Sequence, residues 1–213
     1  MMENLLSKKY LLMFSLFLSA LFIGKQAQAQ YATVSTLPTY TANNGSGLVT
    51  FNFSNTNSYP IMIDTIYMEG SGTGGKFAYL WTNDNPVNGQ PVGAIPSNPD
   101  WTLKYSQETI YQTTNTQQAM MTGIGLIIPA NTTIGMAIGG FQNGTVASPT
   151  SGFMRYFTVP TTTTQPDTFE TNGVEIITGP NISYGYTSFT TTTANHPRGF
   201  VGSIVFQPIN QTP

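Results

Sequence analysis

Apolar and polar residues alternate along most of the chain with the period of two that is typical of β-strands, and helical spacing is scarce. Residues 48–53 (LVTFNF) and residues 60–69 (PIMIDTIYME) both show this alternation. In the second segment the pattern predicts one face made of Ile61, Ile63, Thr65 and Tyr67 and an opposite face made of Met62, Asp64, Ile66 and Met68. Both segments are therefore expected to be strands.

Turn-forming residues divide the chain into about nine to eleven such segments, which predicts an all-β fold: a two-sheet antiparallel β-sandwich of jelly-roll type, with a closed barrel as the alternative. Residues 120–128 and 132–138 are expected to form a hairpin or consecutive strands in opposite sheets. The proline-rich residues 83–99 are expected to be a loop and residues 115–119 a short helical turn. Residues 200–206 (FVGSIVF) are expected to be the final strand.

The first 29 residues are typical of a secretory signal peptide. Lys8 and Lys9 precede an apolar run of 13 residues, 11–23, and the tripeptide Ala27-Gln28-Ala29 follows it. The run is shorter than the ~20 residues that cross a bilayer as a helix, so we expect no membrane span in the mature chain. The predicted organisation is a helical signal peptide at 1–29, an extended N-terminal segment at 30–47 and a β-sandwich domain at 48–213.

Charge and residue types exclude several classes of function. Removal of the first 29 of the 213 residues leaves 184, with four basic and eight acidic side chains. Four basic groups are too few for the positive surface that nucleic acids require. The absence of cysteine excludes disulfides, thiol nucleophiles and Cys-rich zinc sites. We expect a protein that is secreted or held at the cell surface, with the periplasm as the alternative.

Three segments of the chain match a family pattern. Residues 101–103 (WTL), 126–135 (LIIPANTTIG) and 196–206 (HPRGFVGSIVF) occur in this order. Together they resemble a family of exported bacterial β-sandwich domains, in which a Trp-containing strand comes first and a Pro-Arg-aromatic-x-Gly-x-Ile-x-aromatic strand comes last. The resemblance implies a jelly-roll-like sandwich over nearly the whole mature chain. Residues 26–30 (QAQAQ) also resemble the signal-peptide endings of the Gram-negative lineage that uses type IX secretion.

Two sets of residues are candidates for ligand binding. Trp81 and the turn residues Tyr184 and Tyr186 are expected to be exposed, and together they are a candidate aromatic platform on which sugar rings stack. Asn83, Asp84 and Asn85 offer the oxygen ligands that Ca²⁺ prefers, so a structural calcium ion is a candidate cofactor, although plain loop turns explain the same residues. No other cofactor is expected.

Arg198 precedes the last strand, where few acids are available to pair with it. It is expected to be a structural anchor whose guanidinium donates to carbonyl groups or to a carboxylate such as that of Glu175, the alternative being an anionic ligand. His196, the one histidine of the chain, is expected to be a turn residue rather than a catalytic base, because no Ser-x-Gly elbow or acid pair accompanies it.

The preferred interpretation is a non-enzymatic, exported subunit for adhesion or assembly at the cell surface, with itself or other surface proteins as partners. Uncharged faces rich in Thr and Asn favour pairing of strand edges. The candidate assembly segment contains Tyr31, Val34, Leu37 and Tyr40 and is free to pair within the domain or with a neighbour. The alternative is a carbohydrate-binding module that uses the aromatic side chains named above, with glycans as partners. No pair of acids has a context that indicates an enzyme.

Overall fold

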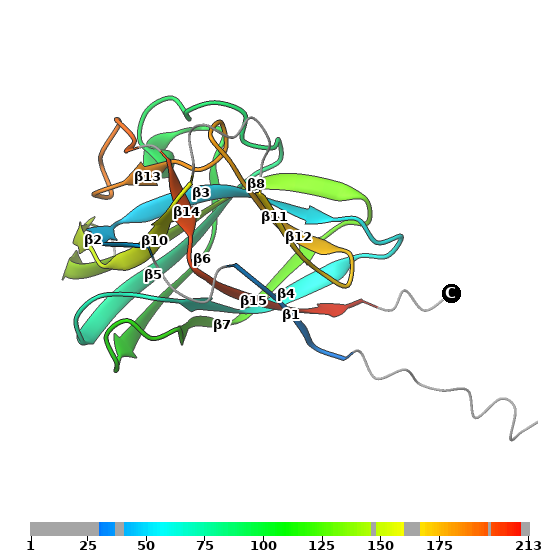
Figure 1. Ribbon diagram of the computed structural model, residues 1–213, viewed down its shortest axis with the longest axis horizontal. Coiled ribbons are helices and arrows are strands. Elements are labelled where there is room, and N and C mark those ends of the chain that lie inside the picture. The colour runs from blue at the N-terminus through cyan, green and yellow to red at the C-terminus, as the bar shows by residue number, and fades with distance from the viewer. Residues whose placement is uncertain (1–29, 37–40, 146–147, 160–166, 196, 210–213) are drawn as a thin grey trace, which may run out of the picture. The chain divides into compact units, whose positions relative to one another are not determined.

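The structure is built almost entirely from antiparallel strands. The computed structural model describes residues 30–36, 41–145, 148–159, 167–195 and 197–209, so the predicted signal peptide lies outside the described residues. The described residues form a two-sheet antiparallel β-sandwich, which confirms the predicted all-β class (Figure 1). They contain 15 strands, more than expected because several are only two to five residues long. Within these residues, no helix has the length and apolar character needed to cross a membrane.

One layer of the sandwich is a four-stranded sheet. Its strands, in order, are β1 (Ala32–Ser35), β15 (Gly202–Pro208), β4 (Ile61–Met68) and β7 (Gln118–Ile128). All neighbouring strands are antiparallel. Because β1 pairs with β15, the sandwich includes residues that precede the predicted domain start at residue 48.

The second layer is an eight-stranded sheet. Six strands follow one another across it: β11 (Asp167–Thr171), β12 (Val174–Thr178), β3 (Leu48–Asn55), β8 (Thr132–Thr145), β5 (Gly74–Asn83) and β6 (Thr102–Tyr111). Two short strands complete it, β13 (Gly185–Tyr186) beside β3 and β9 (Ser148–Gly152) beside β8. The consecutive strands β7 and β8 thus lie in opposite sheets. Of the two arrangements expected for residues 120–128 and 132–138, this is the consecutive-strand arrangement and not the hairpin.

A third, small sheet contains β14 (Arg198–Phe200), β10 (Met154–Thr158) and β2 (Ala42–Ser46). Residues 200–206 were expected to be one strand, but they contribute to two sheets, because Val201 separates β14 from β15. Val201 is fully buried and packs with Phe157 and Val159 at this crossing.

The main core fills the space between the two large sheets, where alternate residues of each strand point inward. Val34, Ile63 and Ile204 come from the four-stranded sheet, and Phe51 from β3 of the other sheet. The Phe51 ring stacks on that of Phe200 with 5.1 Å between ring centroids. The core therefore ties β14 to the large sandwich.

The outer face of the eight-stranded sheet is covered by two segments, residues 84–101 and residues 179–195. The first is a loop, as predicted, with one 3₁₀ turn, η1 (Ile95–Ser97). An apolar cluster joins the sheet to this cover, and we name it the outer cluster; its buried members are Leu48, Tyr79, Trp81, Val87, Ile95, Trp101, Ala137, Phe141, Tyr184 and Tyr186. As a result, all eight residues of β3 are buried.

A bulge reverses the phase of β4. Opposite β15, Ile63 pairs with Phe206 and Thr65 with Val205, so Asp64 is an extra residue without a partner. Opposite Asp64, β7 bulges as well, through Gly123 and Gly125, whose φ angles of 67° and 68° suit glycine. Beyond the bulge, Ile66 and Met68 point into the core instead of Thr65 and Tyr67. The predicted assignment of faces is therefore correct up to Ile63 and wrong after it.

The connection between β6 and β7 is a tight turn rather than the expected helical turn at residues 115–119. Asn115 has a φ of 58°, in the left-handed region that Asn tolerates, and β7 already begins at Gln118. A residue in the left-handed conformation cannot belong to a right-handed helical turn, so Asn115 accounts for the absence of the expected turn.

Candidate functional site

The structure brings Trp81, Tyr184 and Tyr186 together but buries them. Their exposed fractions are 2, 7 and 1%, and all three belong to the outer cluster. Trp81 stacks on the ring of Tyr79 with 5.3 Å between centroids. Burial, together with the nearby Tyr184, raises the pKa of Tyr186 to about 12. The expectation that these rings are exposed for sugar binding is wrong, because they pack the sheet against its cover.

Arg198 spans the small sheet. Its guanidinium carbon lies 4.4 Å from the centroid of the Tyr156 ring on β10, and its Nη1 lies 3.5 Å from Ser46 Oγ on β2. The backbone of Gly185 lies against its aliphatic carbons. These contacts suit the predicted role of Arg198 as a structural anchor. Its partners here are the ring of Tyr156 and the hydroxyl of Ser46, whereas the sequence analysis named the carboxylate of Glu175. His196 lies outside the described residues.

Asn83, Asp84 and Asn85 form the end of β5 and the turn after it. The side-chain Oδ1 of Asn83 accepts a hydrogen bond of 2.9 Å from the backbone N–H of Asn85, which is a local turn interaction. Asp84 and Asn85 are exposed. Within the described part of the chain, no group of three or more His, Cys, Asp or Glu side chains is placed to hold a metal ion. Calcium at this turn stays a prediction.

The candidate assembly segment is part of the domain's own sheet. Residues 32–35 pair with residues 203–206 of β15, and Val34 is fully buried in the main core. Tyr31 is 55% exposed, whereas Leu37 and Tyr40 lie outside the described residues. The segment is therefore not a loose strand that is free to add to a neighbour, because its removal would open the core.

The edges of the two sheets meet along a seam between β6 and β7. Each of these strands has a strand partner on one side only, β5 and β4 respectively. Side chains bridge the seam instead of backbone pairs: Gln118 Nε2 donates to the Ile110 carbonyl at 2.6 Å, the Thr122 N–H donates to Gln107 Oε1 at 2.9 Å, and Tyr105 Oη donates to the Thr122 carbonyl at 2.5 Å. These bridges close one half of the seam and occupy its backbone groups.

The other half of the seam is open, and we name it the seam groove. It has a volume of about 360 Å³ and is lined by Thr82, Asp84, Lys104, Leu126, Ile127, Ile128, Pro129, Thr132 and Ile134. No hydrogen bond joins the described residues of β6 and β7 beyond Tyr105 and Thr122. Ile127, one of the lining residues, is 55% exposed.

The seam groove offers the two things that an extended polypeptide needs: free backbone groups at a sheet edge and apolar contacts for alternate side chains. Lys104 and Asp84 place one charge of each sign at its lining. The sequence analysis missed this site, because it depends on where the two sheets diverge. One signal was present in the sequence of this strand. The alternation that continues to Ile128 places Ile127 at an outward-facing position, where a polar residue is the usual choice.

Comparison with family models and with curated proteins finds no match to this chain. Among solved structures, it is similar to a mutant VP2 protein of infectious bursal disease virus in T=1 particles, with 14% identity over 86% of this chain and 41% of that chain and a TM-score of 0.29. It is also similar to a chain of the Gt strain of that virus, with 14% identity over 86% of this chain and 43% of the other and a TM-score of 0.26. The chain thus spans less than half the length of these viral chains.

Proposed function

We propose that this chain is an exported, non-enzymatic subunit for assembly at the cell surface, and that it accepts a short extended strand from a second copy in the seam groove. The observation that carries the proposal is the pair of facing sheet edges, β6 and β7, to which no other strand of the described residues is paired along the groove. Unpaired edges next to apolar side chains are templates for strand addition.

The closed half of the seam limits how such an assembly forms. The glutamine bridges and the bulge at Gly123 and Gly125 prevent an incoming strand from pairing along the whole edge. Only a short strand fits, at the groove, which favours specific contacts over open-ended sheet extension. The low charge of the chain, with DEKR residues at 8%, leaves little repulsion between copies.

The test is the molar mass of the purified protein, measured by light scattering after chromatography from about 1 to 200 μM. We expect oligomers that grow with concentration and that are weakened about tenfold or more by Ile127→Asp, which places a charge in the groove. Val92→Asp is the matched control, because Val92 is 87% exposed and lies in the loop of residues 84–101, which covers the outer face of the eight-stranded sheet. A wild-type protein that stays monomeric throughout, or equal effects of the two substitutions, would refute assembly through the groove.

A further inference from the structure

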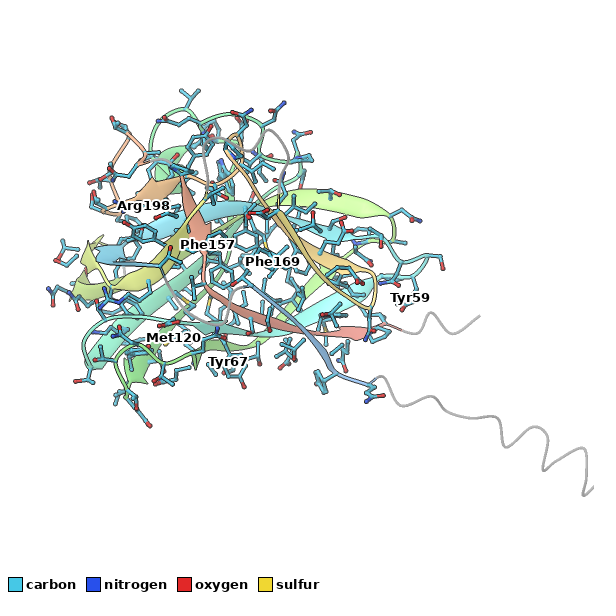
Figure 2. The ribbon with its side chains drawn as sticks, in the orientation of Figure 1. Tyr59, Tyr67, Met120, Phe157, Phe169 and Arg198 are labelled. Atoms are coloured by element: carbon cyan, nitrogen blue, oxygen red, sulfur yellow. The ribbon has the colours of Figure 1, made fainter. Side chains whose placement is uncertain are left out.

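The phase reversal in β4 brings two unexpected side chains to the outer face of the four-stranded sheet. Tyr67 and Glu69 follow the bulge at Asp64 and share this face, whereas their neighbour Met68 points into the core. Tyr67 is half-buried, and Figure 2 shows it on the outer side of the sheet. Ser203 of β15 is its partner across the strands, and Ser35 of β1 is in turn the partner of Ser203. A row of polar and aromatic side chains thus crosses the sheet.

The turn between β6 and β7 is fastened over the end of this row. Gly70 donates its N–H to Tyr111 Oη at 2.8 Å, and Asn115 donates its N–H to the Gly70 carbonyl at 2.8 Å. Tyr111 Oη also donates to the Thr116 carbonyl. On the same side, Arg155 Nε donates to Asn115 Oδ1 at 2.9 Å. The turn is therefore held rigidly beside Glu69 rather than lying loosely in solvent.

Between the turn and the sheet lies a pocket of about 440 Å³, within the size range of small-molecule sites. All of its lining residues carry polar side chains: Ser35, Thr36, Glu69, Asn115, Thr116, Gln117 and Ser203. Ser35 Oγ donates to Ser203 Oγ at 2.9 Å, and Ser203 Oγ donates to Gln117 Oε1 at 2.8 Å. This chain of hydrogen bonds orients the Gln117 side chain and leaves its amide NH₂ as a donor.

Glu69 is the one charged side chain in the lining of this pocket. The residue is 3% exposed, and its carboxylate opens into the pocket, because among the described residues Tyr186 Oη is the one fully enclosed side-chain polar atom without a hydrogen-bond partner. Burial raises the pKa of Glu69, and the charge of the nearby Arg155 opposes that rise only in part. A largely buried carboxylate needs hydrogen-bond donors, and where it opens into a pocket those donors come from whatever occupies the pocket. The Glu69 carboxylate is therefore placed to accept hydrogen bonds from a polar ligand in this pocket.

We propose that this pocket binds a neutral sugar, whose hydroxyl groups donate to Glu69 and accept from Gln117. One face of the sugar ring extends from the pocket onto Tyr67, the cross-strand partner of the lining residue Ser203. Sugars offer adjacent hydroxyl groups that both donate and accept, which matches a lining of carboxylate, amide and hydroxyl groups. The positive charge of Arg155 beside Glu69 disfavours a metal cation. This site is separate from the seam groove, so it stands or falls independently of the proposed assembly.

The experiment is a titration of the isotope-labelled protein, followed by NMR, with glucose, galactose, mannose and N-acetylglucosamine, and separately with CaCl₂. We expect saturable shifts of the Gln117 and Ser203 amide signals with at least one sugar. Glu69→Gln keeps the size of the side chain but replaces one acceptor oxygen with a donating NH₂ and removes the charge, and it should weaken binding about tenfold or more. Tyr67→Ala should weaken binding about tenfold through loss of ring contact.

Tyr59→Ala is the matched control, because Tyr59 is a tyrosine of 40% exposure that lies before β4, at the other end of that strand from Tyr67 and Glu69, and it should leave affinity unchanged. Melting temperatures of all variants establish that they are folded. The absence of shifts with all four sugars would overturn the proposal. Saturable shifts with CaCl₂ alone, abolished by Glu69→Gln, would overturn it in favour of a cation site.

Discussion

The two large sheets carry the same alternation of apolar and polar residues, yet their outer faces differ. In β3 of the eight-stranded sheet all eight residues are buried, whereas in β4 of the four-stranded sheet Met62, Asp64 and Tyr67 remain partly exposed. The cause is the cover formed by residues 84–101 and 179–195, which lies over one sheet only. The comparison teaches that outward polar residues fasten the cover on one sheet and stay partly exposed to solvent on the other.

The polar residues on the covered face of β3 are paired with the cover. Asn52 donates through Nδ2 to the Val87 carbonyl at 3.2 Å and accepts from the Val87 N–H at 2.6 Å. Thr50 donates through Oγ1 to the Ile182 carbonyl at 2.7 Å and accepts from the Tyr184 N–H at 3.0 Å. Each residue thus fastens one of the two covering segments.

The largest expected effect comes from Asn52→Ala. It leaves both backbone groups of Val87 buried without partners and opens a small cavity, so we expect a loss of about 3 kcal/mol and a fall in Tm of roughly 6–12 °C. Met62→Ala, at an outward position of β4, is the control and should cost less than about 1 kcal/mol. Urea unfolding measures both, and equal losses would remove the distinction between the faces.

Thr50→Val should have a smaller effect. The substitution keeps the shape of the side chain and removes the hydroxyl that holds Ile182 and Tyr184, at a cost of about 1–2 kcal/mol. Hydrogen exchange at the Tyr184 amide should become faster, while exchange in β4 should not change. Unchanged exchange at Tyr184 would show that Thr50 does not fasten this segment.

Tyr186→Phe should stabilise the protein. The Tyr186 hydroxyl is buried and has no hydrogen-bond partner among the described residues. Its removal should raise the free energy of unfolding by about 1 kcal/mol, with Tm higher by roughly 2–4 °C. A lower Tm in thermal unfolding would indicate that the hydroxyl has a partner after all.

The smallest effect on stability is expected from Glu69→Gln, on the outer face of the four-stranded sheet. Because burial raises the folded-state pKa of Glu69, the folded state binds a proton more tightly than the unfolded state between the ordinary and the raised pKa. Wild-type stability should therefore rise as the pH falls through the raised pKa toward the ordinary carboxyl pKa of 4.5. The variant should lack this contribution and be slightly more stable near pH 7, by about 1 kcal/mol or less. Thermal unfolding from pH 4 to 8 checks it, and identical pH profiles would contradict it.

The fold class could be read from the sequence because alternation and turn residues are local signals. The loop at residues 83–99 was likewise correct, since prolines exclude a central strand. The burial of Trp81 could not be read, because it depends on residues 179–195, which are distant in sequence.

The face of Tyr67 and Glu69 was missed for a related reason. The bulge at Asp64 is defined by its pairing with β15, about 140 residues later in the chain, and no local pattern marks it. The sequence contained one signal, the acidic residue Glu69 directly after the apolar residue Met68. The alternation alone does not tell whether such an acid marks an outward position or simply the end of the strand.

The position of β15 between β1 and β4 imposes an order on folding. During synthesis, β1 and β4 are made long before β15, yet neither can pair with the other because β15 lies between them. The four-stranded sheet therefore cannot close until residue 208 is available, and contacts of such long sequence separation form slowly. A partly synthesised chain can form the eight-stranded sheet, but its four-stranded sheet lacks a central strand until β15 is made.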